Sequence, residues 1–428
     1  MKARCLAAVL LAVITNGCVH YTPHPIDPAA TAERLEKRSL APKVWSLEAL
    51  REEALHVHPS IAVARAQLDA ARAALLTAGE LPNPTLALTP QVVTPYTALI
   101  SGTYGIDLDF PIETAGKRSH RKAIARSAVV LATTRLTEAQ WKIRASVRKA
   151  FLDLYAAQTR GRLLNEAIAR QDELLKALDA RIAAGEEPRS ASAQPRIART
   201  QLRLQAADTA KNEALAVAAL AEAVGVSSRA ITSARFSFTA FERFPSLKAS
   251  VHKEALTHRA DVLAALAEYA VTEASLRLEV ARQYPDLHLA PGYQLDAGEN
   301  KWGLGIGLTL PILNQNRGPI AEAEAKRTES AAKFDVVQSA ALAECDRATA
   351  LVKATRKKKT VAEELLASQN QILASETKLV EAGEGDRLAL LSARVEQAVV
   401  RALRFDAIVE LQAAIGSLEE AVQSTLAK

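Results

Sequence analysis

The stretch GIDLDFPIETAGKR, residues 105–118, decides the fold because GIGLTLPILNQNRG, residues 305–318, repeats its form. A shift of 200 positions superposes the first glycine, the Pro-Ile pair and a basic residue of the two stretches. Further downstream, AAGEEPR (183–189) matches EAGEGDR (381–387) at a shift of 198. The chain therefore contains two copies of one unit, which together fill nearly its whole length.

Each copy predicts a pair of β-strands. Apolar residues of 104–110 and of 302–310 alternate with small or polar ones, and each segment has a similar partner upstream, TLALT (85–89) and DLHLAPGYQLD (286–296). Strands with one apolar face fit either the wall of a membrane-spanning barrel or a soluble sheet covered by helices. Because a sheet edge cannot stay open in lipid, four strands can span a membrane only when several chains pool them in a ring.

The rest of each copy predicts long helices. Aromatic residues make up 4% of the chain and hydrophobic residues 49%, which is typical of closely packed helices rather than of a core built on large aromatic side chains. Neither glycine nor proline occurs over 320–382, where a helix would be about 95 Å long. Residues 117–184 predict a second such helix, in a segment whose only glycine is Gly161. Glycine turns lead into return helices over 189–224 and 387–423, so each copy is expected to form a long helical hairpin.

The apolar residues of the second long helix keep a seven-residue spacing in two adjacent stripes, which indicates neighbours on two sides. The stripes are Leu365, Ile372 and Leu379, and Leu366, Leu373 and Val380.

The first residues, MKARCLAAVLLAVITNGC, predict a secretory signal peptide over 1–17, with a basic start followed by an apolar run. Small residues before Cys18 also match a bacterial lipoprotein cleavage site, so Cys18 is a candidate for lipid attachment, which mass spectrometry of the mature amino terminus would show. The alternative is ordinary cleavage that leaves a free thiol. The formal net charge is +6, and loss of Lys2 and Arg4 leaves +4, a mild excess that favours no nucleic-acid partner in an exported chain.

Together, the signal peptide, the duplicated helix, strand pair, long helix and return helix, and the paired Pro-Ile motifs resemble the TolC family of outer membrane efflux proteins. The resemblance covers about residues 46–425. FPIETAGKRSHR (110–121) and LPILNQNRGPIAEAEA (310–325) are most similar to the heavy-metal, CzcC-like branch.

This resemblance implies a mainly α fold with a small β part, in which a homotrimer pools its strands into a 12-stranded outer membrane barrel on a helical periplasmic tunnel. It implies a passive channel in outer membrane lipid, without catalysis or cofactor, that is joined through a periplasmic adaptor to an inner membrane pump of the RND type. The expected division of the chain is a signal peptide (1–17), an N-terminal extension (18–45), a first repeat (46–226), a linker (227–247) and a second repeat (248–425).

The resemblance also implies two kinds of site. The hairpin tips are expected to dock the adaptor, and they comprise Arg181, Gly185, Glu186, Glu187, Lys378, Gly383, Glu384 and Asp386. The strand-to-helix junctions comprise Pro111, Lys117, Pro311 and Arg317. The two glycines suit the left-handed conformation that ends a helix. The acidic residues that narrow the pore in the family are replaced here by Ala389 and Ser392.

The remaining sequence features predict no further binding or catalytic site. Beyond the N-terminal extension, the histidines include no pair at the i, i+4 spacing that aligns two ligands on a helix, and Cys345 is isolated, so no metal site is predicted. The basic run 356–359 is expected to be a solvated part of the long helix. Four phenylalanines of the linker are interpreted as a short strand and core on the outside of the tube: Phe236, Phe238, Phe241 and Phe244. The alternative function is an exported helical-hairpin protein that forms no channel, such as a periplasmic adaptor.

Overall fold

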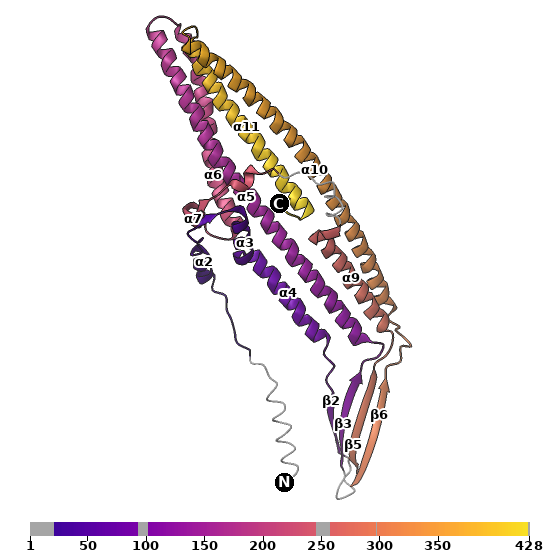
Figure 1. Cartoon of the computed structure of the whole chain (residues 1–428). Coiled ribbons are helices and arrows are strands. Elements are labelled where there is room, and N and C mark those ends of the chain that lie inside the picture. The colour runs from indigo at the N-terminus through magenta and orange to yellow at the C-terminus, as the bar shows by residue number, and fades with distance from the viewer. Residues whose placement is uncertain (1–20, 93–101, 245–256, 297, 427–428) are drawn as a thin grey trace.

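The computed structural model describes residues 21–92, 102–244, 257–296 and 298–426 (Figure 1). The predicted signal peptide and Cys18 lie outside these residues and remain predictions, as does the boundary between residues 247 and 248.

The helical hairpins predicted from the sequence are confirmed. The long helices are α5 (Lys117–Ala183) and α10 (Arg317–Glu381), of 67 and 65 residues. A 3₁₀ turn, η1 (Arg189–Ser192), precedes the return helix α6 (Ala193–Val224), and α11 (Arg387–Val422) returns in the second repeat. The first long helix continues through Gly161. A Cβ at this position would lie 3.7 Å from Thr209 of α6, which is an ordinary van der Waals contact.

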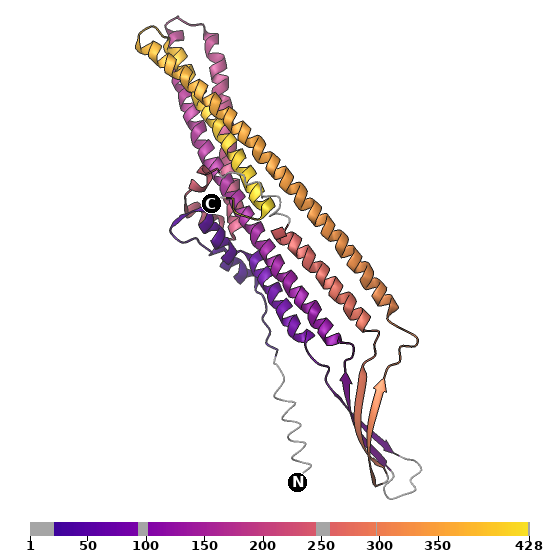
Figure 2. The same cartoon turned by 45° about the vertical axis from the view of Figure 1, so that its right-hand side comes forward.

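Two shorter helices, α4 (Pro59–Ala78) and α9 (Ala260–Ala281), complete the helical layer. Near the sheet, α4, α5, α9 and α10 lie side by side in that order (Figure 1). Near the hairpin tips the order is α6, α5, α11 and α10 (Figure 2). The molecule is therefore a long, curved wall of helices whose two edges are formed by α4 or α6 on one side and by α10 on the other. None of the helices in the described residues combines the length and apolar character needed to cross a membrane.

The four predicted strands form one antiparallel sheet at the end of the wall. They are β2 (Thr85–Val92), β3 (Gly102–Ile112), β5 (Leu287–Asp296) and β6 (Glu299–Leu308), in the spatial order β2-β3-β5-β6. The central pairing joins the two repeats, with Phe110 opposite Leu289.

The two faces of this sheet differ sharply. On one face the large side chains are exposed, among them Leu86, Leu88, Tyr104, Ile106, Trp302, Leu304 and Ile306. The other face is polar or bare, and it includes Gly303, Gly305 and Gly307 of β6. In the described part of the chain no helix packs on the apolar face. The interpretation as a soluble sheet covered by helices is therefore wrong.

A small lobe lies beside the middle of the wall (Figures 1 and 2). It contains α2 (Pro28–Glu36), β1 (Val44–Trp45), α3 (Leu47–Val57), α7 (Ser228–Ser233), β4 (Arg235–Phe236) and η2 (Thr239–Glu242). The strands β1 and β4 pair in parallel, so the segment before the first repeat is joined to the linker after it.

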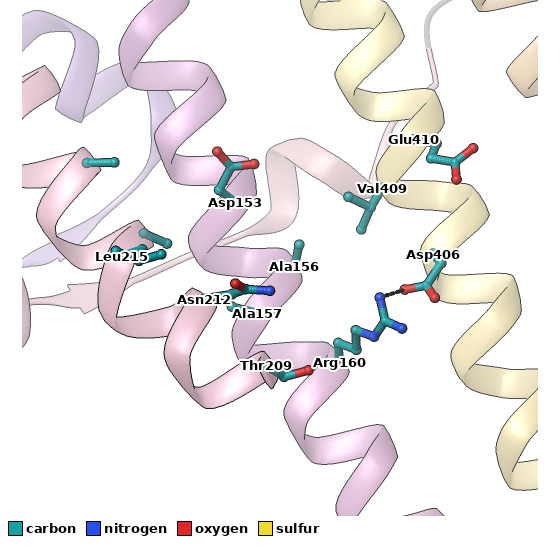
Figure 3. A pocket seen from close by; sticks show the side chains of 12 residues that line it. Asp153, Ala156, Ala157, Arg160, Thr209, Asn212, Leu215, Asp406, Val409 and Glu410 are labelled. Carbon is teal, nitrogen blue, oxygen red and sulfur yellow. Dashed lines mark ion pairs between the residues drawn. The ribbon is translucent and has the colours of Figure 1, made fainter. Parts of the chain in front are cut away.

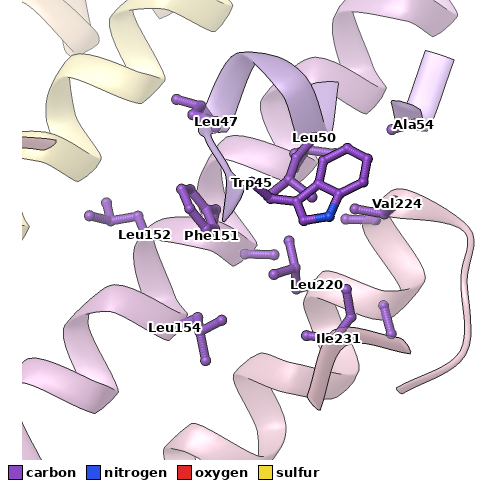
Figure 4. Close-up of a cluster of buried hydrophobic side chains, with 14 of the residues drawn as sticks. Trp45, Leu47, Leu50, Ala54, Phe151, Leu152, Leu154, Leu220, Val224 and Ile231 are labelled. Carbon is purple, nitrogen blue, oxygen red and sulfur yellow. The ribbon is translucent and has the colours of Figure 1, made fainter. Parts of the chain in front are cut away.

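The core of this lobe packs onto α5. Trp45, Phe151 and Phe241 are at most 1% exposed and form one cluster with leucines of α3 and α6 (Figure 4). Phe238 lies with its ring centroid 4.8 Å from that of Phe151. The prediction that the linker phenylalanines form core is confirmed for Phe236, Phe238 and Phe241. It is wrong for Phe244, which is 38% exposed, and the strand comprises only residues 235–236.

A buried ionic cluster lies where the two repeats meet at mid-length. Glu419 of α11 accepts from Arg51 Nη2 of α3 at 3.2 Å, and its side chain and that of Arg51 are both 5% exposed. Arg148 Nε of α5 lies 3.5 Å from the same carboxylate, and Arg148 Nη2 donates to Gln412 Oε1 at 3.1 Å. Gln412 in turn donates to the carbonyl oxygen of Phe241. The cluster thus ties α3, α5, α11 and the linker together.

Candidate functional sites: hairpin tips and strand-to-helix junctions

The two hairpin tips have the same backbone geometry. Gly185 and Gly383 have φ of +78° and +77°, as predicted for residues that end a helix in the left-handed region. Around Gly185, the amide of Glu186 donates to Arg181 O at 2.9 Å and the amide of Gly185 to Ile182 O at 3.1 Å. The same two bonds recur around Gly383. Both long helices are therefore closed by a Schellman motif.

The second tip holds a further glycine that the sequence interpretation missed. A Cβ at Gly385 would lie 2.7 Å from Val380 N and 2.9 Å from Leu379 Cβ, so even alanine would collide with the helix end. The corresponding residue of the first repeat is Glu187. The second repeat has glycine where the first has glutamate, and this difference was the sequence signal that could have revealed the residue. The chain packs more tightly against the helix end at the second tip.

An arginine joins the two tips. Arg181 Nη1 lies 3.0 Å from Asp386 Oδ1, and its Nε lies 3.1 Å from Glu186 Oε2. Glu187 lies 4.0 Å from the same guanidinium. Of the predicted tip residues, the structure therefore gathers these four into one ionic cluster, whereas Lys378 and Glu384 have no contact with it among the described ion pairs.

The two positions that the resemblance matches to a pore-narrowing acidic pair carry uncharged side chains here. Ala389 and Ser392 are exposed on the first turns of α11, while the neighbouring Leu390 and Leu391 are buried.

At the first strand-to-helix junction, Lys117 begins α5 and is only 7% exposed. Its Nζ donates to Asp286 Oδ1 at 2.8 Å and to Tyr284 O at 2.6 Å. The amide of Thr114 donates to the same carboxylate at 2.9 Å. Residues just after β3 ends and before β5 begins are thus clamped across the two repeats. Pro111 lies in β3, opposite His288.

The second junction is built differently. Arg317 begins α10 but is exposed, and its guanidinium contacts Gln315. Asn316, at φ +58°, instead anchors this junction by donating from Nδ2 to Glu279 O at 2.7 Å. Pro311 follows the end of β6. The repeated motif therefore marks equivalent positions, but only the first basic residue is buried.

Burial on its own would raise the pKa of Asp286, but hydrogen bonds from Lys117 and from the Thr114 amide outweigh it and lower the pKa. A lowered pKa contributes stability that is present above the ordinary aspartate pKa and is lost as pH falls through the lowered value.

We expect Lys117→Met to destabilise the protein by about 1–3 kcal/mol at pH 7, because it removes the charged donor to Asp286 and the donor to the carbonyl of Tyr284. The difference in Tm from wild type, measured in detergent, should shrink below about pH 4 as Asp286 protonates. Arg317→Met is the matched control at the exposed junction and should change Tm little. An equal decrease of Tm in both variants would show that the buried hydrogen bonds of Lys117 do not stabilise this junction.

A groove of about 500 Å³ with a mixed apolar and polar lining runs over α5 between α6 and α11 (Figure 3). Arg160 Nη1 lies 3.3 Å from Asp406 Oδ1 in it, and burial raises the pKa of both Asp153 and Asp406. Tyr155, between these groove residues on α5, stacks on Phe241 of the lobe. The groove therefore lines the side of the wall that faces away from the lobe.

Among the described residues, no three His, Cys, Asp or Glu side chains are grouped so as to hold a metal ion.

These features define a class of protein in which duplicated long helical hairpins carry a small antiparallel sheet with an exposed apolar face. The family model of the outer membrane efflux protein matches residues 50–226 and 251–422, and the chain belongs to this family. Members of this family act in the outer membrane, which is where the chain belongs.

Two relatives come from Cupriavidus metallidurans. The cobalt-zinc-cadmium resistance protein CzcC is 28% identical over 65% of this chain, and the nickel and cobalt resistance protein CnrC is 28% identical over 53%. The matched region spans 66% and 54% of the lengths of these relatives. Among solved structures, the outer membrane protein VceC from Vibrio cholerae superposes with a TM-score of 0.71 and 21% identity, covering 89% of this chain and 96% of that one. The fold is thus that of known outer membrane channels.

Proposed function

We propose that this protein is the outer membrane channel of a tripartite efflux system and that it works as a homotrimer. The observation that carries the proposal is the sheet, because its exposed apolar face and its two unpaired edges require lipid and further strands. Three copies would supply twelve antiparallel strands, above the roughly eight with which membrane barrels begin. The apolar face would contact outer membrane lipid, and the polar face would line the pore.

The edges of the helical wall support side-by-side association of copies. On α10, Leu365, Ile372 and Leu379 are 48%, 51% and 43% exposed, although their spacing is that of packed helices. On α6, at the opposite edge, Ile197 and Leu204 are 51% and 66% exposed. Both stripes begin close to the tips, so neighbouring copies would bury one against the other.

The tips are proposed to dock a periplasmic adaptor that connects the channel to an inner membrane pump of the RND type. They lie at the end of the wall opposite the sheet, where both long helices reverse (Figure 1). The channel itself would be passive, and its energy would come from the pump.

Divalent transition-metal cations are the proposed cargo. The support is the similarity to proteins named for cobalt, zinc, cadmium and nickel resistance. Cargo selection would belong to the pump at least in part, because no described group of residues forms a closed metal site.

We expect the purified protein to require detergent, to migrate as an oligomer, and to form discrete ion-conducting channels in planar bilayers. Light scattering and single-channel recording measure these properties. Recovery of a monodisperse monomer without detergent would contradict the proposal and favour the alternative, an exported helical-hairpin protein such as a periplasmic adaptor.

A further inference from the structure

A histidine and an aspartate pair on the polar face of the sheet, close to its junction with the helices. His288 is the second residue of β5, and its Nδ1 lies 3.0 and 3.2 Å from the two carboxylate oxygens of Asp109 on β3. Both side chains remain partly exposed, at 43% and 38%. The pair thus faces the space that the proposed pore would enclose.

The carboxylate fixes which imidazole nitrogen is free. An ionised Asp109 can only accept, so Nδ1 carries the proton that it donates, and Nε2 of the neutral ring keeps its lone pair. No described residue bonds to Nε2. A carboxylate that holds one ring nitrogen while the other binds a metal is the usual support of metal-ligating histidines.

The strand next to the histidine carries no side chain opposite it. His288 lies opposite Gly307, where an added Cβ would come within 3.2 Å of the Cβ of His288, and Gly305 and Gly303 follow on the same face of β6. Gly305 and Gly303 border a hollow of about 340 Å³. Ala290, two residues from His288 on β5, also lines this hollow, so the hollow lies next to the histidine along the face.

A second carboxylate lies on the same face. Asp107 is two residues from Asp109, about 7 Å along the strand, and it lines the hollow. It packs over Gly292 of β5 and has no ion pair with a described residue. Charged groups on this face of the sheet are mostly acidic, with Lys301 already paired to Asp296 at 2.7 Å. The face therefore attracts cations toward the histidine.

The geometry points to His288 as a transit ligand for borderline transition-metal cations such as Zn²⁺, Co²⁺ and Cd²⁺, with Asp109 as its positioning residue and Asp107 as a neighbouring anionic contact. Imidazole prefers these ions over Mg²⁺ and Ca²⁺, which select oxygen ligands. One nitrogen per chain binds weakly, as conduction requires of a site that an ion must also leave. The inference rests on the proposed channel function, because only a ring of copies encloses this face.

Single-channel recording of the full-length oligomer in KCl, with ZnCl₂ added to either side, tests the inference. We expect Zn²⁺ to interrupt the current of the wild type, and His288→Ala to raise the Zn²⁺ concentration for half-block about ten-fold or more. His288→Gln keeps a polar side chain of similar reach and should raise the half-block concentration by a similar factor. Asp109→Asn removes the carboxylate that orients the ring but keeps the imidazole, so it should raise the half-block concentration by a smaller factor.

The controls separate this inference from the proposed function. His56→Ala changes an exposed histidine of the lobe and should leave the Zn²⁺ response unchanged, and MgCl₂ should affect wild type and His288→Ala alike. Normal channels whose Zn²⁺ response is the same in wild type and both His288 variants would overturn the inference and leave the channel standing. Failure of the wild type to form any channel would overturn both.

Discussion

Replacing Glu419 with alanine is expected to lower the stability of the folded protein by about 3–5 kcal/mol, the cost of leaving a buried charge without its partner. Two arginines share this carboxylate, and both are nearly inaccessible to water. Burial already lowers the pKa of Arg148, an effect that Glu419 opposes and the charge of Arg51 reinforces. Without Glu419, the guanidinium groups of Arg51 and Arg148, both from the first repeat, would stay buried without the carboxylate that the second repeat supplies.

The matched control is Glu48→Ala. Glu48 also bonds to Arg51, with Oε1 2.7 Å from Nη1, but its side chain is 59% exposed. Exposed pairs contribute roughly 0–1 kcal/mol, so this variant should unfold nearly as the wild type does. Tm in detergent and the amount of oligomer in the outer membrane measure the difference. Equal effects of the two alanine variants would show that the buried carboxylate does not hold the repeats together.

The second large effect is expected at the hairpin tips. Gly383→Val and Gly185→Val place a β-branched residue at positive φ, which costs about 1–2 kcal/mol for an ordinary L-residue and more for a β-branched one. No atom lies within 4 Å of the position that a Cβ would take at either glycine, so the strain comes from the backbone alone and the rest of the fold should remain. We expect normal oligomers in the outer membrane, but metal resistance no higher than in cells without the protein.

Gly298→Val is the control for backbone strain. Gly298 has φ +93° and open space around it, but it lies between β5 and β6 at the far end of the molecule. The same change should therefore leave resistance intact. Gly385→Ala should behave like Gly383→Val because of the collision with the helix end. Full resistance in both tip valine variants would show that docking occurs elsewhere.

Much of this architecture could be predicted from the sequence because it depends on local signals. Long segments almost free of glycine, each ended by a glycine turn, gave the limits of α5 and α10 to within a few residues, and alternation located all four strands. The left-handed tip glycines followed from the same reasoning.

What could not be predicted depends on contacts between distant segments. Arg51, Arg148 and Glu419 look like ordinary solvated charges in helical sequence, and only the packing of α3 and α11 on α5 buries them together. Lys117 and Arg317 are equivalent in the repeat, yet the structure buries only the first, which pairs with Asp286. The partner of His288 likewise depends on the strand order across the two repeats.

The antiparallel order β2-β3-β5-β6 has a consequence for biogenesis. The two edge strands run in opposite directions, so β6 of one copy can extend the ladder of β2 of the next without a parallel step. An assembly with too few copies still has one unpaired β2 edge and one unpaired β6 edge. Such edges cannot lie in lipid, and in water they promote aggregation. The helical hairpins rely on contacts close in sequence and can form before this point. In the proposed trimer, closing the ring and entering the membrane would then be a single event, and each chain would have to be kept apart from wrong partners until it occurred.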